Sequence, residues 1–121
     1  MKFGVWQGMS IADVKESYPE QFDLWCNQPE ILAIPDGETL EDVRRRSVAT
    51  IEGLAAKHGG ETIAAVTHRV ICKVLLCHLL GLDNSHFWQI EQDTTAINVF
   101  ELEEGKTTVH LINDTCHLKN G

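Results

Sequence analysis

The most regular pattern of apolar positions lies between residues 62 and 80. Residues 62–66 (Thr-Ile-Ala-Ala-Val) form a short, mostly apolar run with β-branched members, which is typical of a buried strand in a parallel sheet. From Val70 the apolar residues recur as in a helix, and Gly81 provides a stop. A strand, a polar junction and a helix make half of a βαβ unit. The pattern therefore predicts an α/β fold with residues 62–66 as a central strand and helices on its faces.

Helix-start signals divide the first sixty residues. Ser10 and Thr39 are each followed three residues later by an aspartate, which is an acidic variant of the capping box. Pro19 suits the first position of a further short helix. We therefore expect two short helices, a Pro- and Gly-containing loop, and then a long helix over residues 40–58.

The last third of the chain has the signals of a hairpin. Residues 96–102 and 107–112 are predicted strands, and the turn between them contains Gly105. Residues 83–88 indicate a short helical turn before the first strand. Since there is no repeat, low-complexity segment or linker, we expect residues 1–121 to form a single domain.

Composition narrows the possible functions. The chain has 121 residues and a formal net charge of −8, which argues against a nucleic-acid surface and leaves any anion site to local charges. No segment is long and apolar enough to cross a membrane, and the N-terminus has no signal-peptide core. The four cysteines show no metal-binding spacing. We therefore expect a reduced, cytoplasmic protein without a metal or another cofactor.

Candidate chemistry lies at the junction between the predicted strand and helix, where His68 and Arg69 follow residues 62–66. Ligands of α/β proteins gather at the carboxyl ends of strands, and the first turn of a helix offers free N–H groups to an anion. A cation such as Arg69 is unfavourable near the positive end of the helix dipole, and a negative group bound beside it would offset this repulsion. The alternative is that His68 only caps the helix and Arg69 points to water. The sequence pattern alone does not decide between an anion site and this structural role.

Several segments together resemble the histidine phosphatase superfamily, which includes the cofactor-dependent phosphoglycerate mutases. Their order and spacing match the family over nearly the whole chain, although each is a weak signal by itself. The segments are residues 3–8 (Phe-Gly-Val-Trp-Gln-Gly), 18–20 (Tyr-Pro-Glu), 36–43 (Asp-Gly-Glu-Thr-Leu-Glu-Asp-Val), 66–68 (Val-Thr-His) and 113–118 (Asn-Asp-Thr-Cys-His-Leu).

The resemblance implies a phosphoglycerate mutase-like three-layer sandwich, in which helices flank a mostly parallel sheet that ends in a C-terminal hairpin. It implies that His68 is the family's second catalytic histidine, which holds the phosphoryl oxygens during transfer. Arg69 stands where many relatives have glycine, and we expect it to assist phosphate binding. The ligand would be a phosphorylated small molecule or inorganic phosphate.

Other positions that match the family have weaker implications. Glu38 and Thr39 match it, but we interpret them as the end of a loop and a helix cap. Thr94, Thr95 and Asn98 fall where relatives place small polar residues near the pocket.

The resemblance covers only the C-terminal part of these enzymes. Family members normally open with a strand that ends in Arg-His-Gly, whose histidine becomes phosphohistidine, and no such triplet occurs in the 121 residues. A second phosphate-binding arginine and an acid–base glutamate are also unmatched. Because phosphoryl transfer needs a nucleophile, charge clamps and an acid, we expect a truncated phosphatase or phosphotransferase domain that is inactive as an isolated chain.

Whether the protein acts as an enzyme stays open at this stage. The alternatives are a non-catalytic domain that binds anions or self-associates, and a fragment without a function of its own. In the resembled fold the Arg-His-Gly strand pairs with the strand at residues 62–66. We therefore expect homo-oligomers, or a missing N-terminal segment, to complete the sheet.

Overall fold

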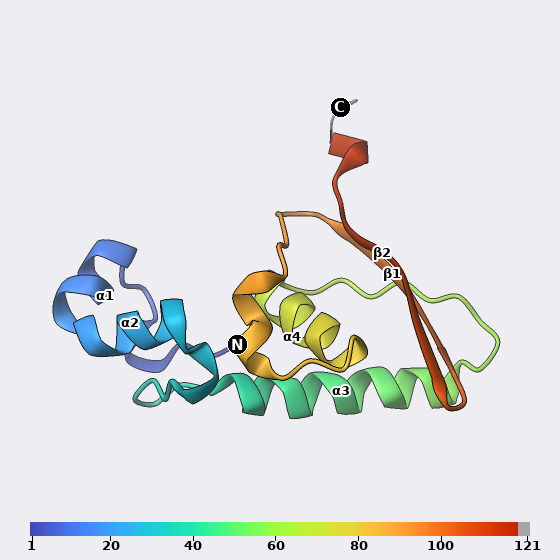
Figure 1. The fold of residues 1–121 in the computed structure, drawn as a ribbon, viewed down its shortest axis with the longest axis horizontal. Coiled ribbons are helices and arrows are strands. Elements are labelled where there is room, and N and C mark those ends of the chain that lie inside the picture. The colour runs from blue at the N-terminus through green and yellow to red at the C-terminus, as the bar shows by residue number, and fades with distance from the viewer. Residues whose placement is uncertain (119–121) are drawn as a thin grey trace.

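Helices fill the first two thirds of the chain, and a β-hairpin follows them (Figure 1). The structure is a computed structural model and describes residues 1–118. The helices are α1 (Ile11–Ser17), α2 (Pro19–Asn27), α3 (Leu40–Lys57) and α4 (Arg69–Leu79). The remaining elements are the 3₁₀ segments η1 (Gly4–Trp6), η2 (Pro29–Ile31), η3 (Asn84–Gln89) and η4 (Cys116–Leu118), and the strands β1 (Ile97–Glu103) and β2 (Lys106–Asp114). Within residues 1–118 no helix is long and apolar enough to span a membrane.

The predicted helix starts in the N-terminal part are confirmed. The Ser10 hydroxyl accepts a hydrogen bond from the backbone N–H of Asp13 at 3.1 Å, and Pro19 occupies the first turn of α2. With η1, these helices form a small unit at one end of the molecule (Figure 1). Its buried side chains are Trp6, Val14, Leu32 and Ile34.

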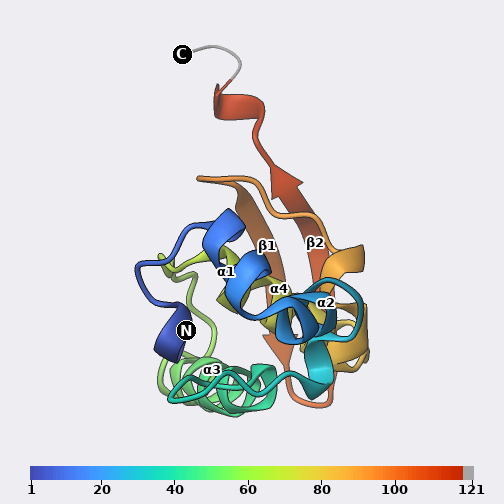
Figure 2. The same cartoon turned by 90° about the vertical axis from the view of Figure 1, so that its left-hand side faces the viewer.

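The long helix α3 joins this unit to the rest of the molecule. It runs beneath α4, as the view from the side of α1 and α2 also shows (Figure 2), and the two helices pack through Val43 and Val74, which have no exposed surface. Phe87 of η3 closes the same cluster at 1% exposure. The core of the molecule therefore lies between α3, α4 and η3.

The predicted C-terminal hairpin is confirmed. Strands β1 and β2 pair antiparallel, with Glu103 opposite Lys106 beside the turn. Gly105 in that turn has a φ of +72°, a left-handed conformation that favours glycine. The hairpin packs through Val109 on a third cluster, which consists of Leu76, Cys77 and Ile90.

The predicted parallel sheet is not confirmed, and neither is the three-layer sandwich built on it. Within residues 1–118 the only sheet is the two-stranded antiparallel pair of β1 and β2. Residues 62–66 are extended but belong to no strand, and every one of them is exposed. The expected burial is therefore wrong, because no neighbouring strand or helix covers this segment. It runs back along α3 to the start of α4 as a single extended stretch (Figure 1).

The cap of α3 gives a first testable expectation. Thr39 and Asp42 form the predicted capping box: the Asp42 N–H donates to the Thr39 hydroxyl at 3.1 Å, and the Thr39 N–H donates to the Asp42 carboxylate at 3.0 Å. Thr39→Ala should lower the free energy of unfolding by about 1 kcal/mol, measured by urea denaturation. Thr50→Ala is the matched control, because the Thr50 hydroxyl only donates to a carbonyl of the preceding turn. An equal loss in both variants would contradict the role of the cap.

The same box predicts a dependence of stability on pH. The hydrogen bond from the Thr39 backbone, and next that from its hydroxyl, hold the pKa of Asp42 below its ordinary value of 3.8. A carboxyl whose pKa is lower in the folded state stabilises the fold above its unfolded pKa and loses that contribution as the pH falls through the folded pKa. The difference in stability between the wild type and Asp42→Asn should therefore shrink in acid.

Candidate anion site at the start of α4

His68 stands where the extended segment becomes helix α4. It is the N-cap residue, with φ of −108° and ψ of 162°, and no side chain caps the helix. The first hydrogen bond of α4 runs from the N–H of Cys72 to the carbonyl of His68. Within residues 1–118 the preceding three N–H groups, those of Arg69, Val70 and Ile71, have no hydrogen-bond partner outside the helix. The structure thus places His68 and Arg69 together at an uncapped, exposed helix N-terminus.

The charges around this terminus differ from those at the other helices. Each of α1, α2 and α3 has an acidic residue in its first turn, which is the usual complement to the positive end of the helix dipole. The first turn of α4 has none and begins with Arg69. This end of the helix therefore carries a positive charge and donors that nothing in residues 1–118 neutralises.

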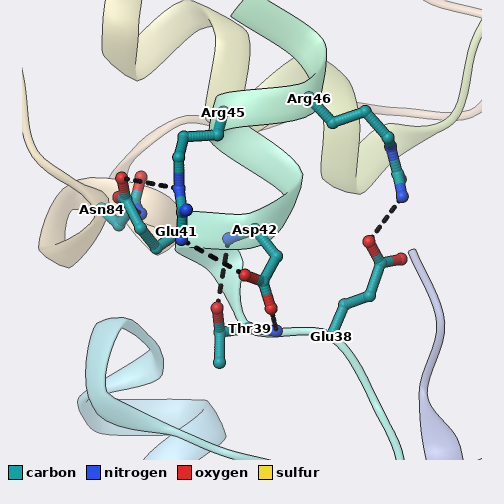
Figure 3. A network of polar contacts seen from close by, with 7 residues as sticks. All are labelled: Glu38, Thr39, Glu41, Asp42, Arg45, Arg46 and Asn84. Atoms are coloured by element: carbon teal, nitrogen blue, oxygen red, sulfur yellow. Dashed lines mark hydrogen bonds and ion pairs between the residues drawn. The ribbon is translucent and has the colours of Figure 1, made fainter.

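Two of the family-matched residues have structural roles, as the sequence interpretation proposed. Glu38 accepts a hydrogen bond from the backbone N–H of Lys2 at 2.7 Å and forms an ion pair with Arg46 (Figure 3). Thr39 forms the capping box described above. Glu38 therefore attaches the N-terminal segment to the start of α3, while Thr39 caps that helix. Neither residue forms a hydrogen bond with His68 or Arg69.

The polar residues before the hairpin form a network of their own. Asn98 exchanges two hydrogen bonds with Gln92, at 2.9 Å and 2.8 Å. The N–H of Asn113 donates to the same Asn98 oxygen at 2.9 Å. Thr94 and Thr95 form a turn in which Thr95 has a φ of +60°. No recorded hydrogen bond links Thr94, Thr95 or Asn98 to His68 or Arg69.

The two cysteines of α4 are poorly suited to act as nucleophiles. Burial raises the pKa of the Cys72 and Cys77 thiols on α4, which disfavours the reactive thiolate. Cys26 and Cys116 are exposed and free. Among the residues that the structure describes, no group of three or more His, Cys, Asp or Glu side chains is placed to hold a metal ion.

An aromatic groove begins beside Arg69, and the sequence interpretation missed it. The groove has a volume of about 480 Å³ and lies between the N-terminal unit on one side and α4 with η3 on the other. Its aromatic walls come from Phe3, Trp6, Phe22, Trp25, Phe87 and Trp88. Trp6 and Trp25 pack in the N-terminal unit and also line this space. Because its walls come from distant parts of the chain, no local pattern marks the groove.

The aromatic wall is held in a fixed arrangement. The ring centroids of Trp25, Phe87 and Trp88 are mutually 5.0–5.4 Å apart. The indole N–H of Trp88 donates to the backbone carbonyl of Trp25 at 2.6 Å. Lys73 lies against two of these rings, with its Nζ 5.0 Å from the centroid of Phe87 and 4.4 Å from that of Trp88.

The helical fold and the matching motifs together define a class of protein. The chain belongs to the histidine phosphatase superfamily, since a sequence profile of its branch 1 matches residues 1–115. The chain is 35% identical over 115 residues to phosphoserine phosphatase 1 of Hydrogenobacter thermophilus, a match that covers 95% of this chain and 54% of that protein. Putative phosphoserine phosphatase 2 of the same organism is 24% identical, with 98% of this chain and 58% of that protein covered.

A solved structure has the same path of the chain. Bacillus stearothermophilus YhfR superposes with a TM-score of 0.92 at 26% identity, over 97% of this chain and 58% of that one. The alpha-ribazole phosphatase from Shigella flexneri has the same fold, with a TM-score of 0.77 at 23% identity over 94% of this chain and 56% of that one. The chain spans about half the length of the curated relatives it matches.

Proposed function

We propose that this chain provides the phosphate-holding part of a histidine phosphatase site, with His68 and the N-terminus of α4 as its centre. The observation that carries the proposal is the positive, uncapped start of α4, where three N–H groups, His68 and Arg69 meet without an acidic neighbour in the first turn. Backbone donors at a helix N-terminus suit a phosphoryl group. The imidazole of His68 donates a further hydrogen bond to a phosphoryl oxygen, and Arg69 adds charge.

The proposed ligand is a phosphorylated small molecule. Support comes from the family and from relatives whose names specify phosphoserine. The 121 residues hold the phosphate-binding side of the site but contain no Arg-His-Gly motif. The phosphohistidine step therefore requires a nucleophile that this chain does not supply, and turnover of p-nitrophenyl phosphate by the isolated chain should be absent.

A second function is favoured by the extended segment at residues 62–66. Among residues 1–118 its backbone has no hydrogen-bond partner, and its side chains are exposed. Such a segment suits association with a second polypeptide. The alternative function is therefore a non-catalytic domain that binds an anion at the start of α4 and associates through residues 62–66. Both proposed functions use the same anion site. They differ in that the second involves no phosphoryl transfer, even after the chain has bound its partner.

Inorganic phosphate tests the anion site directly. Titration into the isolated chain should shift the ring resonances of His68 with saturating behaviour, because the imidazole gains a charged hydrogen-bond partner. His68→Ala should weaken phosphate binding by about tenfold or more, since a hydrogen bond to a charged group contributes roughly 1.5–3 kcal/mol. His110→Ala is the matched control: this histidine is half-exposed and pairs with Glu101 on the hairpin, at 3.2 Å. Unmoved His68 resonances at millimolar phosphate would refute the proposal.

A further inference from the structure

The side chain of Lys73 has different surroundings from those of the other lysines. It is partly buried on the wall of the aromatic groove. Its Nζ lies against the rings of Phe87 and Trp88 and takes part in no ion pair within residues 1–118. The other described lysines are all exposed: Lys2, Lys15, Lys57 and Lys106. Lys73 is therefore an amine held beside an open space rather than a solvated surface charge.

The surroundings of Lys73 also favour the nucleophilic form of its amine. Burial, and next the positive charge of Arg69, lower the pKa of Lys73, while Glu91 and Cys77 act in the opposite direction. A lower pKa leaves more neutral amine at neutral pH, and only the neutral amine attacks a carbonyl carbon. The ring faces stabilise a positive charge on this nitrogen. A protonated imine carries the same charge as the ammonium ion, so the aromatic wall also suits the product of that attack.

Lys73 lies one helical turn from the proposed phosphate site. Arg69 precedes it by four residues on α4, and both residues line the groove, so the two side chains are neighbours on one face of the helix. One turn of an α-helix advances about 5.4 Å along the axis. A small ligand whose phosphate binds at the start of α4 therefore has its remaining atoms beside the Lys73 amine.

We infer that Lys73 is a covalent binding site for phosphorylated aldehydes, which its amine captures as a reversible imine. The inference rests on the proposed function, since the phosphate of the ligand is taken to bind at the start of α4. The neutral amine adds to the carbonyl carbon, and both of its protons leave with the carbonyl oxygen as one molecule of water. No oxidant or reductant is required. Because the captured ligand occupies the phosphate site, a phosphorylated aldehyde competes there with phosphate monoesters.

Pyridoxal 5′-phosphate is the probe, because its aldehyde and its phosphate ester stand on neighbouring ring carbons. Borohydride reduces the imine to a stable secondary amine, and peptide mapping by mass spectrometry then gives the yield of adduct at each lysine of the wild-type chain. We expect Lys73 to form adduct at least about tenfold faster than Lys57, because a bound phosphate makes the attack effectively intramolecular. Inorganic phosphate should protect Lys73 and leave Lys57 unchanged.

Controls separate anchored capture from general lysine reactivity. Pyridoxal, which lacks the phosphate, should show no preference for Lys73. Lys73→Arg keeps the positive charge but cannot form an imine, so the fast phase of imine absorbance should disappear. Lys57→Arg is the matched control at the C-terminal end of α3 and should retain that phase. Far-ultraviolet circular dichroism confirms that both variants are folded, and the peptide mapping of the wild-type chain depends on neither.

The outcomes distinguish this inference from the proposed function. Equal yields at Lys73 and Lys57, or the same preference for Lys73 with pyridoxal, overturn the inference, and the phosphate site stands if inorganic phosphate still shifts His68. Adduct formation at Lys73 that inorganic phosphate does not slow also overturns it, because the ligand would then be anchored elsewhere. Labelling of Lys73 that needs the phosphate ester but is unchanged in His68→Ala supports capture by Lys73 and refutes the role of His68 in the phosphate site.

Discussion

Replacing Gly4 with alanine should destabilise the chain by roughly 2–5 kcal/mol, one of the largest effects expected from a single methyl group here. Gly4 has a φ of +55°, in the left-handed region that disfavours other residues. A Cβ at this position would lie 2.1 Å from the carbonyl oxygen of Pro35 and 2.4 Å from the backbone nitrogen of Gly37. Both contacts are with backbone, which cannot rotate away as a side chain can.

The cost of the Gly4 variant follows from how the N-terminal segment is attached. The N–H of Val5 donates to the Pro35 carbonyl at 3.0 Å, and the N–H of Glu38 donates to the Lys2 carbonyl at 2.8 Å. An added Cβ must push these two stretches apart and break their hydrogen bonds. The segment also supplies Phe3 and Trp6 to the aromatic groove, so Gly4→Ala should disturb one wall of that groove as well.

Two other glycines provide controls for this prediction. Gly8 has a φ of +81°, but a Cβ added there would have no atom within 4 Å, so Gly8→Ala isolates the conformational strain and should cost about 1 kcal/mol. Gly53 lies inside α3 with equally open surroundings, and Gly53→Ala should stabilise the chain by roughly 0.5–1 kcal/mol. Urea denaturation measures all three. If Gly4→Ala costs no more than Gly8→Ala, the N-terminal segment is not docked on the loop before α3.

The helices could be predicted from sequence because their signals are local. Ser10, Pro19 and Thr39 each start a helix at the expected position, and Gly81 follows the end of α4 with a φ of +74°. A cap needs only residues within one turn of one another. The hairpin was predictable for the same reason, since Gly105 and the flanking strands are neighbours in the chain.

The predicted sheet failed because strand pairing is not local. The β-branched pattern of residues 62–66 correctly indicated an extended backbone, but whether an extended segment joins a sheet depends on a partner strand elsewhere. Within residues 1–118 no partner lies beside it. The sequence pattern therefore predicted the conformation of this segment and not its burial.

The candidate site was predictable in part. The junction pattern placed His68 and Arg69 at the start of a helix, which the structure confirms, while their role in phosphate binding stays a prediction. The groove was not predictable, since Trp25 and Trp88 are 63 residues apart and meet only through tertiary packing. Lys73 gave no signal either, because a lysine on a helix usually lies on its solvated face.

The chain should form dimers at low micromolar concentration through residues 62–66. Val66 is fully exposed and Ile63 is 45% exposed. In the part of the chain that the structure describes, the backbone of residues 62–67 has no hydrogen-bond partner. An extended apolar stretch with free N–H and C=O groups is a template for another strand. Two copies related by a two-fold axis satisfy each other's backbone groups by antiparallel pairing.

Sedimentation velocity tests this association with two kinds of variant. Ala65→Pro removes a backbone donor from the segment, and Val66→Lys removes apolar surface. Each variant should therefore raise the dissociation constant of the dimer about tenfold or more. Ile31→Lys is the matched control, because Ile31 is 59% exposed in η2 and the change in net charge is the same. Adding a lysine makes the net charge of −8 less negative, which by itself weakens repulsion between copies. Loss of the dimer in Val66→Lys but not in Ile31→Lys must therefore come from the segment itself, whereas a wild-type chain that stays monomeric would show that residues 62–66 do not mediate self-association.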